Sequence, residues 1–235
     1  MNKKIIVVPT YNESENIIEL TNSLKKIEAD IVFVDDNSPD KTQEIIKSHN
    51  QYNESIFLIS RDRKDGYASA CIEGIKYSIE KGYKYVIQMD ADLSHSAKDL
   101  SKLIEASESN DLVIGSRYVK EGKTSGWGLN RIILSKGANA FAKIYLNQNI
   151  NDLTSGFRIY KSEILNHIEL EQIKSEGYGF LVEILYKITL ISNQIKEVPI
   201  HFNDRKFGKS KMDSKIILEA MKLVITLPFR TRFFS

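Results

Sequence analysis

Strand-length apolar runs recur along the first half of the chain, and each run ends in a cluster of polar residues. Segments of helical character separate these runs, which occupy residues 3–10, 30–36, 55–61, 83–90 and 111–117. Continuous apolar runs are typical of parallel strands buried on both faces. Their alternation with helices indicates a doubly wound α/β sheet. We therefore expect a mostly parallel sheet flanked by helices.

Helices are expected between these runs and in the second half of the chain. Asn12 or Ser14 is expected to cap the first, through Ile17, Ile18, Leu20 and Leu24. The others are expected over 42–49, 68–80 and 98–107, from near residue 130, and after residues 176–180. A Gly-rich loop (121–128), a turn (152–158), a strand (195–202) and a basic loop (203–211) complete the second half.

Length and composition favour one globular domain. The chain has 235 residues, of which 42% are hydrophobic and 27% charged. Its single cysteine, Cys71, excludes an internal disulfide and a Cys-rich zinc site, and is expected to pack inside a helix. Neither a signal peptide nor an apolar stretch of about 18 residues is present, so we expect a cytoplasmic protein without transmembrane helices.

Two aspartates, one residue apart, close the fourth apolar run. Asp90 and Asp92 are expected to point the same way, with small Ala91 between them, because strand side chains alternate between faces. Their like charges repel each other, and a cation is the usual compensation. Oxygen ligands favour Mg²⁺ or Mn²⁺. For this short pattern alone, a solvated turn at the strand end is an equal alternative.

Polar clusters follow four of the expected strands, at residues 9–13, 35–38, 90–95 and 115–117. Ligands of doubly wound sheets bind at the carboxyl ends of the strands. Asp35 and Asp36 suit hydrogen bonding to a ribose or a base. The Gly-rich phosphate-binding motifs of dinucleotide-binding proteins and P-loop enzymes are absent from the sequence. A metal on Asp90 and Asp92 would therefore hold the two phosphates of a nucleotide diphosphate.

A second anion site is expected on the helix that starts near residue 130. Arg131 and Ser135 are four residues apart and share a face of that helix. Together with Arg117 they offer two guanidiniums and a hydroxyl, which suit a phosphate group. Asp152 is expected to pair with Arg117 or Arg158 and to pre-order the site. A surface helix with ordinary salt bridges is the alternative.

The C-terminal end is basic. Residues 201–235 contain eight Lys/Arg and three Asp/Glu, whereas the whole chain has a net charge of only +2. This excess suggests phosphate groups or an anionic membrane surface as partners, and no nucleic acid is expected. We expect an amphipathic helix over 215–227, followed by an aromatic and cationic tail that suits a membrane interface. Packing of the tail on the domain is the alternative.

These motifs carry a family resemblance that covers essentially the whole chain. In chain order, PTYNE, DDNSPD, DADLSH, GSRY, TSGFR and VPIHFNDRKFGKSK resemble the family 2 glycosyltransferases, and more narrowly the polyprenol-phosphate (dolichol-phosphate) mannose synthases. The resemblance implies one GT-A domain with a nucleotide-sugar half (1–118), an acceptor half with a closing basic loop (119–211), and a C-terminal helix and tail (212–235). It also implies a GDP-mannose donor, a polyprenyl or dolichyl phosphate acceptor, and Mg²⁺ or Mn²⁺ as cofactor.

The resemblance also implies roles for individual residues. The guanosine pocket would be lined by Pro9, Tyr11, Glu13, Val34 and Asp36. The metal and the donor would be held by Asp90, Ala91 and Asp92, with the Ser94 hydroxyl as a weaker third metal ligand. The diphosphate would be covered by Arg205 and Lys211, and the acceptor phosphate bound by Arg117, Arg131 and Ser135. Asp90, Asp92 and Arg117 are the residues expected to carry catalysis.

The expected reaction needs no catalytic base. A phosphate monoester is already largely dianionic at pH 7, because its second pKa is about 6. Its oxygen would attack the anomeric carbon in line with the departing GDP, which gives a β-mannosyl phosphate by inversion. Glu183 is expected either to orient the sugar or a basic residue, or to form a core salt bridge.

Two alternatives remain open at this point. One is a polyprenol-phosphate glucosyl- or N-acetylhexosaminyltransferase that uses a UDP-sugar. The other is a non-catalytic subunit that binds a nucleotide-sugar. For the leading interpretation we expect peripheral association with the cytoplasmic face of a membrane, directly or through a small membrane-anchoring subunit.

Overall fold

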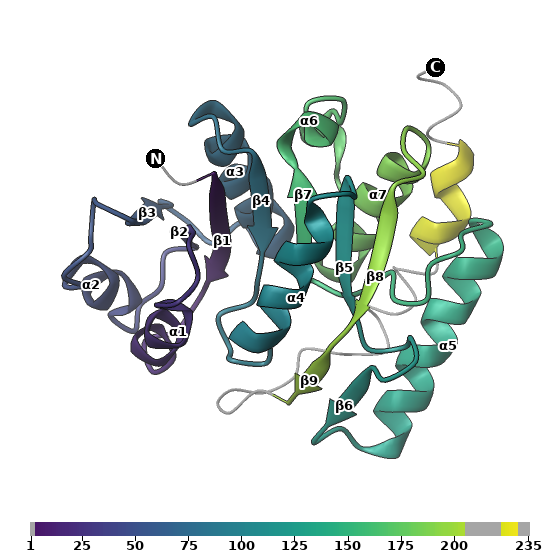
Figure 1. Ribbon diagram of the computed structural model, residues 1–235, viewed down its shortest axis with the longest axis horizontal. Coiled ribbons are helices and arrows are strands. Elements are labelled where there is room, and N and C mark those ends of the chain that lie inside the picture. The colour runs from purple at the N-terminus through teal and green to yellow at the C-terminus, as the bar shows by residue number, and fades with distance from the viewer. Residues whose placement is uncertain (1–2, 205–221, 230–235) are drawn as a thin grey trace.

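A seven-stranded sheet forms the centre of the molecule in a computed structural model that describes residues 3–204 and 222–229 (Figure 1). The strand order is β3-β2-β1-β4-β7-β5-β8, and β7 alone runs antiparallel to its neighbours. The strands are β1 (Lys4–Thr10), β2 (Asp30–Asp35), β3 (Ile56–Ser60), β4 (Tyr85–Gln88), β5 (Leu112–Ser116), β7 (Arg158–Lys161) and β8 (Ile195–Pro199). A separate two-stranded sheet pairs β6 (Lys123–Ser125) with β9 (His201–Asn203). The expected mostly parallel α/β sheet is confirmed.

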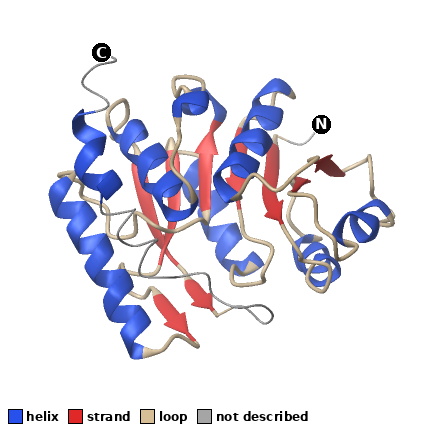
Figure 2. Cartoon of the chain, turned by 180° about the vertical axis from the view of Figure 1, so that it is seen from behind, coloured by secondary structure: helices blue, strands red, loops and turns tan. Residues whose placement is uncertain are grey.

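Helices cover both faces of the large sheet, as the two views in Figures 1 and 2 show. They are α1 (Ile17–Leu24), α2 (Thr42–Lys47), α3 (Tyr67–Glu80), α4 (Ala97–Ser107), α5 (Leu129–Tyr145), α6 (Ser162–Leu165) and α7 (Gly177–Thr189), with a 3₁₀ turn at Leu170–Gln172. The side chains of successive residues of β1 lie on opposite faces of the sheet. Val7 belongs to the core under α3 and α7, whereas Ile6 belongs to the core under α1 and α4. Both side chains are fully buried, and each contributes roughly 1.5–3 kcal/mol.

The chain reverses its direction of travel across the sheet between β1 and β4. From β1 it moves outward through β2 and β3, and it then returns to place β4 on the other side of β1. Ligand sites of open α/β sheets lie at such a switch point, beyond the carboxyl ends of the strands. In this protein the polar clusters that follow β1 and β4 meet there.

One strand of the sheet was not expected from the sequence. β7 begins at Arg158, inside the segment predicted as a turn over 152–158. Arg158 is fully buried, and its guanidinium donates to the carbonyl oxygens of Ser155 at 2.7 Å, Leu181 at 2.8 Å and Leu153 at 2.7 Å. These bonds compensate the burial of a charge. A buried arginine has no signature in an apolar pattern, and the turn prediction was therefore wrong over its last residue.

The expected cap of the first helix was also wrong. Helix α1 follows Asn16 as its N-cap residue, and the Asn16 side chain makes no capping bond. Asn12 adopts a left-handed conformation at φ 61°, and the backbone N–H of Ser14 donates to Asp40 at 3.0 Å. Both residues therefore belong to the loop that links β1 to α1 and contacts the start of α2.

The C-terminal helix is described only over residues 222–229. Leu223, Val224 and Leu227 are buried in the core, and the Tyr145 hydroxyl of α5 donates to the carbonyl oxygen of Ile225 at 3.2 Å. This part of the expected helix packs on the domain, while its residues before 222 and the tail after residue 229 lie outside the described residues. Among the residues that the structure describes, no helix has the length and apolar character needed to cross a membrane.

Candidate functional site

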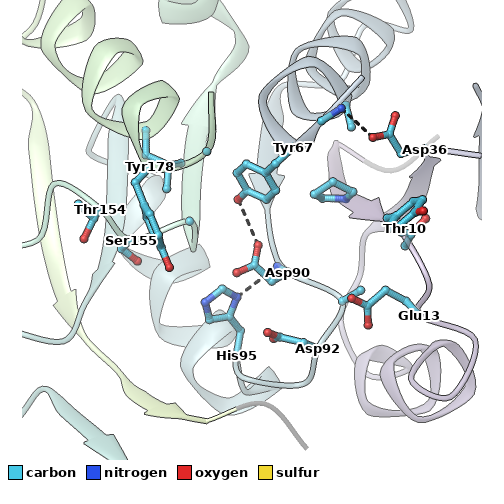
Figure 3. A pocket seen from close by; sticks show the side chains of 18 of the residues that line it. Thr10, Glu13, Asp36, Tyr67, Asp90, Asp92, His95, Thr154, Ser155 and Tyr178 are labelled. Carbon is cyan, nitrogen blue, oxygen red and sulfur yellow. Dashed lines mark hydrogen bonds between the residues drawn. The ribbon is translucent and has the colours of Figure 1, made fainter. Parts of the chain in front are cut away.

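A cavity of about 330 Å³ lies at the switch point between β1 and β4 (Figure 3). Its walls come from the end of β1 and the loops after β1, β2, β3, β4 and β5. The start of α3, the segment before β7, strand β9, and the segments at the starts of α5 and α7 complete them. The predicted site residues that line it are Pro9, Tyr11, Glu13, Asp36, Asp90, Ala91, Asp92, Arg117 and Arg131. The two halves of the expected site thus share one cavity.

Asp36 holds the loop that follows β3 against the cavity. Its Oδ1 accepts from Arg61 Nη1 at 2.7 Å and from the backbone N–H of Asp65 at 2.9 Å. Its Oδ2 accepts from the backbone N–H of Gly66 at 2.8 Å, and the Lys64 ammonium lies 3.6 Å from the centroid of the Tyr11 ring. This carboxylate therefore orders the rim of the cavity, a role that sequence reasoning did not foresee.

Val34, predicted in the guanosine pocket, does not line the cavity. Its side chain is fully buried under α3, where a Cβ added to Gly74 would lie 3.0 Å from its methyl group. Asp35 is also buried and accepts hydrogen bonds from Thr10, Ser38 and Gln43. Of the two neighbouring acids, only Asp36 reaches the cavity.

Asp90 and Asp92 both line the cavity, but strand alternation is not the reason. β4 ends at Gln88, so both aspartates lie in the following loop, in which Leu93 takes a left-handed conformation at φ 62°. The Tyr67 hydroxyl donates to Asp90 Oδ1 at 3.1 Å, and Asp92 Oδ1 accepts from the backbone N–H of Ser94 at 3.1 Å. Loop geometry, and not the pleat of a strand, therefore brings the two carboxylates to one cavity (Figure 3).

A buried hydrogen-bond chain supports Asp90. Tyr160 donates to Gln88 Oε1 at 3.0 Å, and Gln88 Nε2 donates to the Tyr67 hydroxyl at 2.9 Å, which in turn donates to Asp90. Burial, followed by the charge of Asp90, raises the pKa of Tyr67 well above its ordinary value. Tyr67 therefore stays protonated and remains a hydrogen-bond donor to the carboxylate.

His95 supports the same loop from the other side. Its Nδ1 accepts from the backbone N–H of Asp90 at 3.3 Å, and its ring stacks on Phe157 with 4.5 Å between centroids. Burial lowers the pKa of His95, which favours the neutral imidazole that this contact requires. The motif DADLSH contained this residue, but nothing in its spacing distinguished a ring that supports the loop from a surface histidine.

The residues present fit a divalent metal held mainly by its substrate. Two carboxylates, Asp90 and Asp92, line one cavity, and no group of three or more His, Cys, Asp or Glu in the described chain could form a full protein cage. Mg²⁺ is commonly bound by one or two carboxylates together with phosphate oxygens and water. The Ser94 hydroxyl, predicted as a weaker ligand, is buried without a described partner and does not line the cavity.

Arg117 is fixed at the other end of the cavity by Asp152. Its Nε and Nη2 donate to the two carboxylate oxygens at 2.7 and 2.6 Å, and its backbone N–H donates to Asp152 at 3.0 Å. Burial alone would raise the pKa of Asp152, but the charge and hydrogen bonds of Arg117 outweigh it and lower that pKa. The expected Asp152 pair is confirmed with Arg117, since Arg158 bonds to backbone carbonyls.

Arg131 and Ser135 occupy different environments, although they share a helix. Arg131 lines the cavity, and its Nη1 donates to Asp204 at 3.1 Å. The Ser135 hydroxyl is buried, accepts from the Tyr118 hydroxyl at 2.6 Å and does not line the cavity. The two guanidiniums are therefore brought together, whereas contact of Ser135 with an acceptor phosphate stays a prediction.

The remaining predicted residues are Glu183, which does not line the cavity, and two residues of the basic loop. Glu183 is buried in α7, accepts a hydrogen bond from Ser175 and forms no ion pair with any described residue. Arg205 and Lys211, expected to cover the diphosphate, lie outside the described residues. Sequence reasoning missed Tyr67, Trp127 and Tyr178, which all line the cavity.

Comparison with known proteins gives a consistent family assignment. The model of the family described as "Glycosyl transferase family 2" matches residues 5–169. The undecaprenyl-phosphate mannosyltransferase of Micrococcus luteus is 37% identical over 219 residues, which are 92% of this chain and 90% of that protein. The polyprenol monophosphomannose synthase of Mycolicibacterium smegmatis is 34% identical over 98% of this chain and 88% of its own length.

A third relative is longer than this chain. The dolichol-phosphate mannosyltransferase of Pyrococcus furiosus is 38% identical over 96% of this chain, which spans 63% of that protein. Among solved structures, glucosyl-3-phosphoglycerate synthase from Mycobacterium tuberculosis matches with a TM-score of 0.69 at 15% identity, covering 96% of this chain and 80% of that one. The same enzyme with Mn²⁺ and UDP-glucose gives 0.67 at 16% identity, covering 97% and 78%. At this identity the likeness establishes the fold.

Proposed function

Because this chain belongs to glycosyl transferase family 2, with a GT-A fold, we propose that it transfers mannose from GDP-mannose to a polyprenyl or dolichyl monophosphate. Three relatives named for mannosyl transfer to, or mannose synthesis on, such lipid phosphates share 34–38% identity over nearly the whole chain. One observation carries the proposal. A single cavity joins two carboxylates, which suit a metal-bound diphosphate, to two guanidiniums, which suit a second phosphate.

The carboxylate end of the cavity fits the donor. Asp90 and Asp92 would hold a divalent metal, which when bound would neutralise the charge that develops on the departing diphosphate. One of the structural neighbours was crystallised with Mn²⁺ and UDP-glucose, which supports a divalent metal in this fold without deciding between Mg²⁺ and Mn²⁺. Pro9, near the end of β1, and Tyr11 and Glu13, in the loop that follows it, are proposed to contact the nucleoside.

The guanidinium end fits the acceptor. Arg117 has its Nε and Nη2 fixed by Asp152, so its orientation is set before a ligand arrives. Arg117 and Arg131 would bind the acceptor phosphate and aim one of its oxygens at the anomeric carbon. Positioning and charge stabilisation then supply the catalysis, because a phosphate dianion needs no base. A single displacement in line with the leaving diphosphate inverts the anomeric centre.

We also propose that α5 and the helix over 222–229 lie on a membrane surface. Positions on one side of α5 carry large apolar side chains that are strongly exposed, with Leu129 at 70%, Ile133 at 61% and Ile144 at 79%. Ile225 and Phe229 extend this surface, and the bond from Tyr145 to Ile225 joins the two helices. Exposed apolar helix faces of this kind suit insertion at a lipid interface.

Charge supports an anionic lipid surface as the occupant. Helix α5 contains Arg131, Lys136 and Lys143 and no acidic residue. Basic residues near a bilayer are attracted to anionic headgroups, which are concentrated in the cytoplasmic leaflet of cell membranes. The same helix contributes Arg131 to the cavity, so docking along α5 would bring a lipid-borne phosphate close to its binding residues.

Vesicle binding tests the membrane proposal. The protein is expected to sediment with vesicles of phosphatidylglycerol and phosphatidylcholine, and more weakly with phosphatidylcholine alone. Ile133→Asp and Ile144→Asp should each weaken binding, whereas Ile18→Asp, at an exposed apolar position of α1 on the other side of the molecule, should not. Equal binding by all three variants would overturn the proposal, and a protein anchor would then become the better explanation.

A transfer assay tests the reaction. The protein is incubated with a short polyprenyl phosphate, Mg²⁺ or Mn²⁺, and in turn GDP-mannose, GDP-glucose, UDP-glucose or UDP-GlcNAc. We expect lipid-linked product with GDP-mannose alone, and its β-anomeric configuration is read by NMR. Product formed only with a UDP-sugar would be consistent with the proposed mechanism but would show that the donor is not GDP-mannose. Metal-dependent nucleotide binding without product would favour a non-catalytic subunit.

A further inference from the structure

Trp127 lies against both arginines of the acceptor end. The Arg131 guanidinium carbon is 4.0 Å from the centroid of the Trp127 ring, and that of Arg117 is 5.4 Å from it. All three side chains line the cavity. Cations within about 6 Å of an indole centroid are attracted to the ring. The same ring thus contacts both cationic groups that are proposed to bind the acceptor phosphate.

The backbone around Trp127 is held from two sides. Gly126 takes a left-handed conformation at φ 83°, and a Cβ added there would lie 2.8 Å from Asp204 Cβ. The pairing of β6 with β9 continues into this turn, where the backbone N–H of Asp204 donates to the carbonyl oxygen of Ser125 at 2.9 Å. The ring of Phe202 meets Trp127 edge to face at 5.4 Å. The two-stranded sheet of β6 and β9 therefore fixes the position of the indole ring.

The hydrogen-bond donors of this group are incompletely used. Arg131 Nε and Trp127 Nε1 are both buried and have no hydrogen-bond partner among the described residues. Arg117 uses Nε and Nη2 on Asp152 and Thr154, and Arg131 uses Nη1 on Asp204. Buried donors without partners are rare in folded proteins and call for an explanation. An oxyanion, which offers several acceptor oxygens, supplies what these donors lack.

We propose that Trp127 is a positioning residue for the acceptor phosphate. The indole face sets the spacing and orientation of the Arg117 and Arg131 guanidiniums, and the indole N–H is a further donor for the same phosphate. This inference rests on the proposed function, because it assigns the phosphate at the guanidinium end to the acceptor substrate. It assigns a role to the only tryptophan of the chain, for which the sequence alone indicated none.

Two substitutions at Trp127 separate the ring from its N–H. Trp127→Leu removes both, so the KM for a short polyprenyl phosphate should rise by about tenfold or more, with the KM for GDP-mannose little changed. Trp127→Phe keeps an aromatic face and should cause a smaller rise. A rise equal to that of Trp127→Leu would show that the N–H carries the effect. An acceptor KM unchanged in both variants would overturn the proposal.

A remote aromatic provides the control for packing effects. Phe141 of α5 packs against the core and does not line the cavity, so Phe141→Leu should lower the thermal stability without changing the acceptor KM selectively. If the Trp127 variants instead raised the KM values of donor and acceptor equally, in proportion to their loss of stability, the residue would be structural and the proposal wrong.

Fluorescence tests binding without catalysis, since Trp127 is the only tryptophan of the chain. A short prenyl monophosphate, added to the wild-type protein without donor, should give a saturable change in emission that inorganic phosphate competes away. The corresponding prenyl alcohol should give no such change. An equal response to the alcohol would overturn the phosphate assignment. Failure of the proposed function is distinct, because the wild-type protein would then make no product with any donor.

Discussion

Asp152 provides the sharpest test of how the acceptor end is built. Its side chain is fully buried, and it accepts three hydrogen bonds from Arg117 at 2.6, 2.7 and 3.0 Å. Arg117 is itself 7% exposed. The substitution Asp152→Asn keeps the shape and one acceptor oxygen but removes the negative charge. It therefore leaves a buried guanidinium without its counter-charge.

The expected loss of stability is large. Removing one partner of a buried ion pair costs roughly 3–5 kcal/mol, and the lower end applies because Asn retains an acceptor. A domain of 150–250 residues shifts its Tm by about 2–4 °C per kcal/mol. Asp152→Asn should therefore lower the Tm by roughly 6–12 °C. The loss is a substantial share of the roughly 5–15 kcal/mol that stabilises a typical domain.

Differential scanning calorimetry measures this shift, with Asp111→Asn as the matched control. Asp111 pairs with Lys161 at 3.2 Å, but both side chains are partly exposed, and such pairs contribute about 0–1 kcal/mol. At a temperature where both variants are folded, Asp152→Asn should also raise the acceptor KM, because Arg117 loses its bidentate anchor, and leave the donor KM nearly unchanged.

A double variant tests whether the uncompensated charge of Arg117 causes the loss of stability. If an uncompensated charge causes the loss, the double variant Arg117→Gln with Asp152→Asn should be less destabilised than Asp152→Asn alone, since both charges are gone. A double variant at least as unstable as the single one would show that lost hydrogen bonds or packing dominate. A Tm for Asp152→Asn equal to that of Asp111→Asn would show that the pair contributes little to folding.

Three further outcomes are expected. Asp92→Asn should reduce the transfer rate at least about 100-fold while the far-UV circular dichroism stays that of the wild type, and full activity would contradict the metal-site interpretation. Gly74→Ala should cost roughly 1–3 kcal/mol in urea unfolding, because its Cβ would lie 2.3 Å from Val7 Cγ1, whereas Gly137→Ala on the open face of α5 should be neutral or slightly stabilising. The free energy of unfolding should fall below about pH 4, because the unfolded chain then protonates Asp152, whereas the folded chain, in which the Asp152 pKa is lowered, does not. It should fall again above about pH 10, because Tyr67 then ionises in the unfolded chain but not in the folded chain, in which its pKa is raised. A flat profile at either end would contradict that assignment.

Much of the site could be predicted because chemistry and strand ends are local features of a sequence. Asp90, Asp92, Arg117 and Arg131 all line one cavity, as their motifs indicated. Apolar runs reveal buried parallel strands, and the carboxyl ends of such strands meet at one edge of a sheet whatever the details of packing. The family resemblance added the substrates, which no pattern of charge or hydropathy could supply.

The sequence did not reveal the partners of individual side chains where those partners come from distant parts of the chain. Val34 faces the core under α3. The Asp36 carboxylate accepts hydrogen bonds from residues of the segment 61–66, which lie 25 or more positions along the chain. Ser135 is held by Tyr118, and its contact with a ligand stays a prediction. These outcomes depend on which loop lies over which strand, and a spacing rule does not contain that information.

The sequence by itself determined the α/β class, the family, and the pair of carboxylates and guanidiniums, because hydrophobic periodicity and motif chemistry are written in neighbouring residues. Tertiary structure alone decided the rest. It inserted antiparallel β7 around buried Arg158, pinned Arg117 on Asp152, and set Trp127 against both guanidiniums. The reason is physical. A buried charge or an aromatic contact is stabilised by groups that only folding brings together, and the positions of these groups along the chain do not show that they will be in contact.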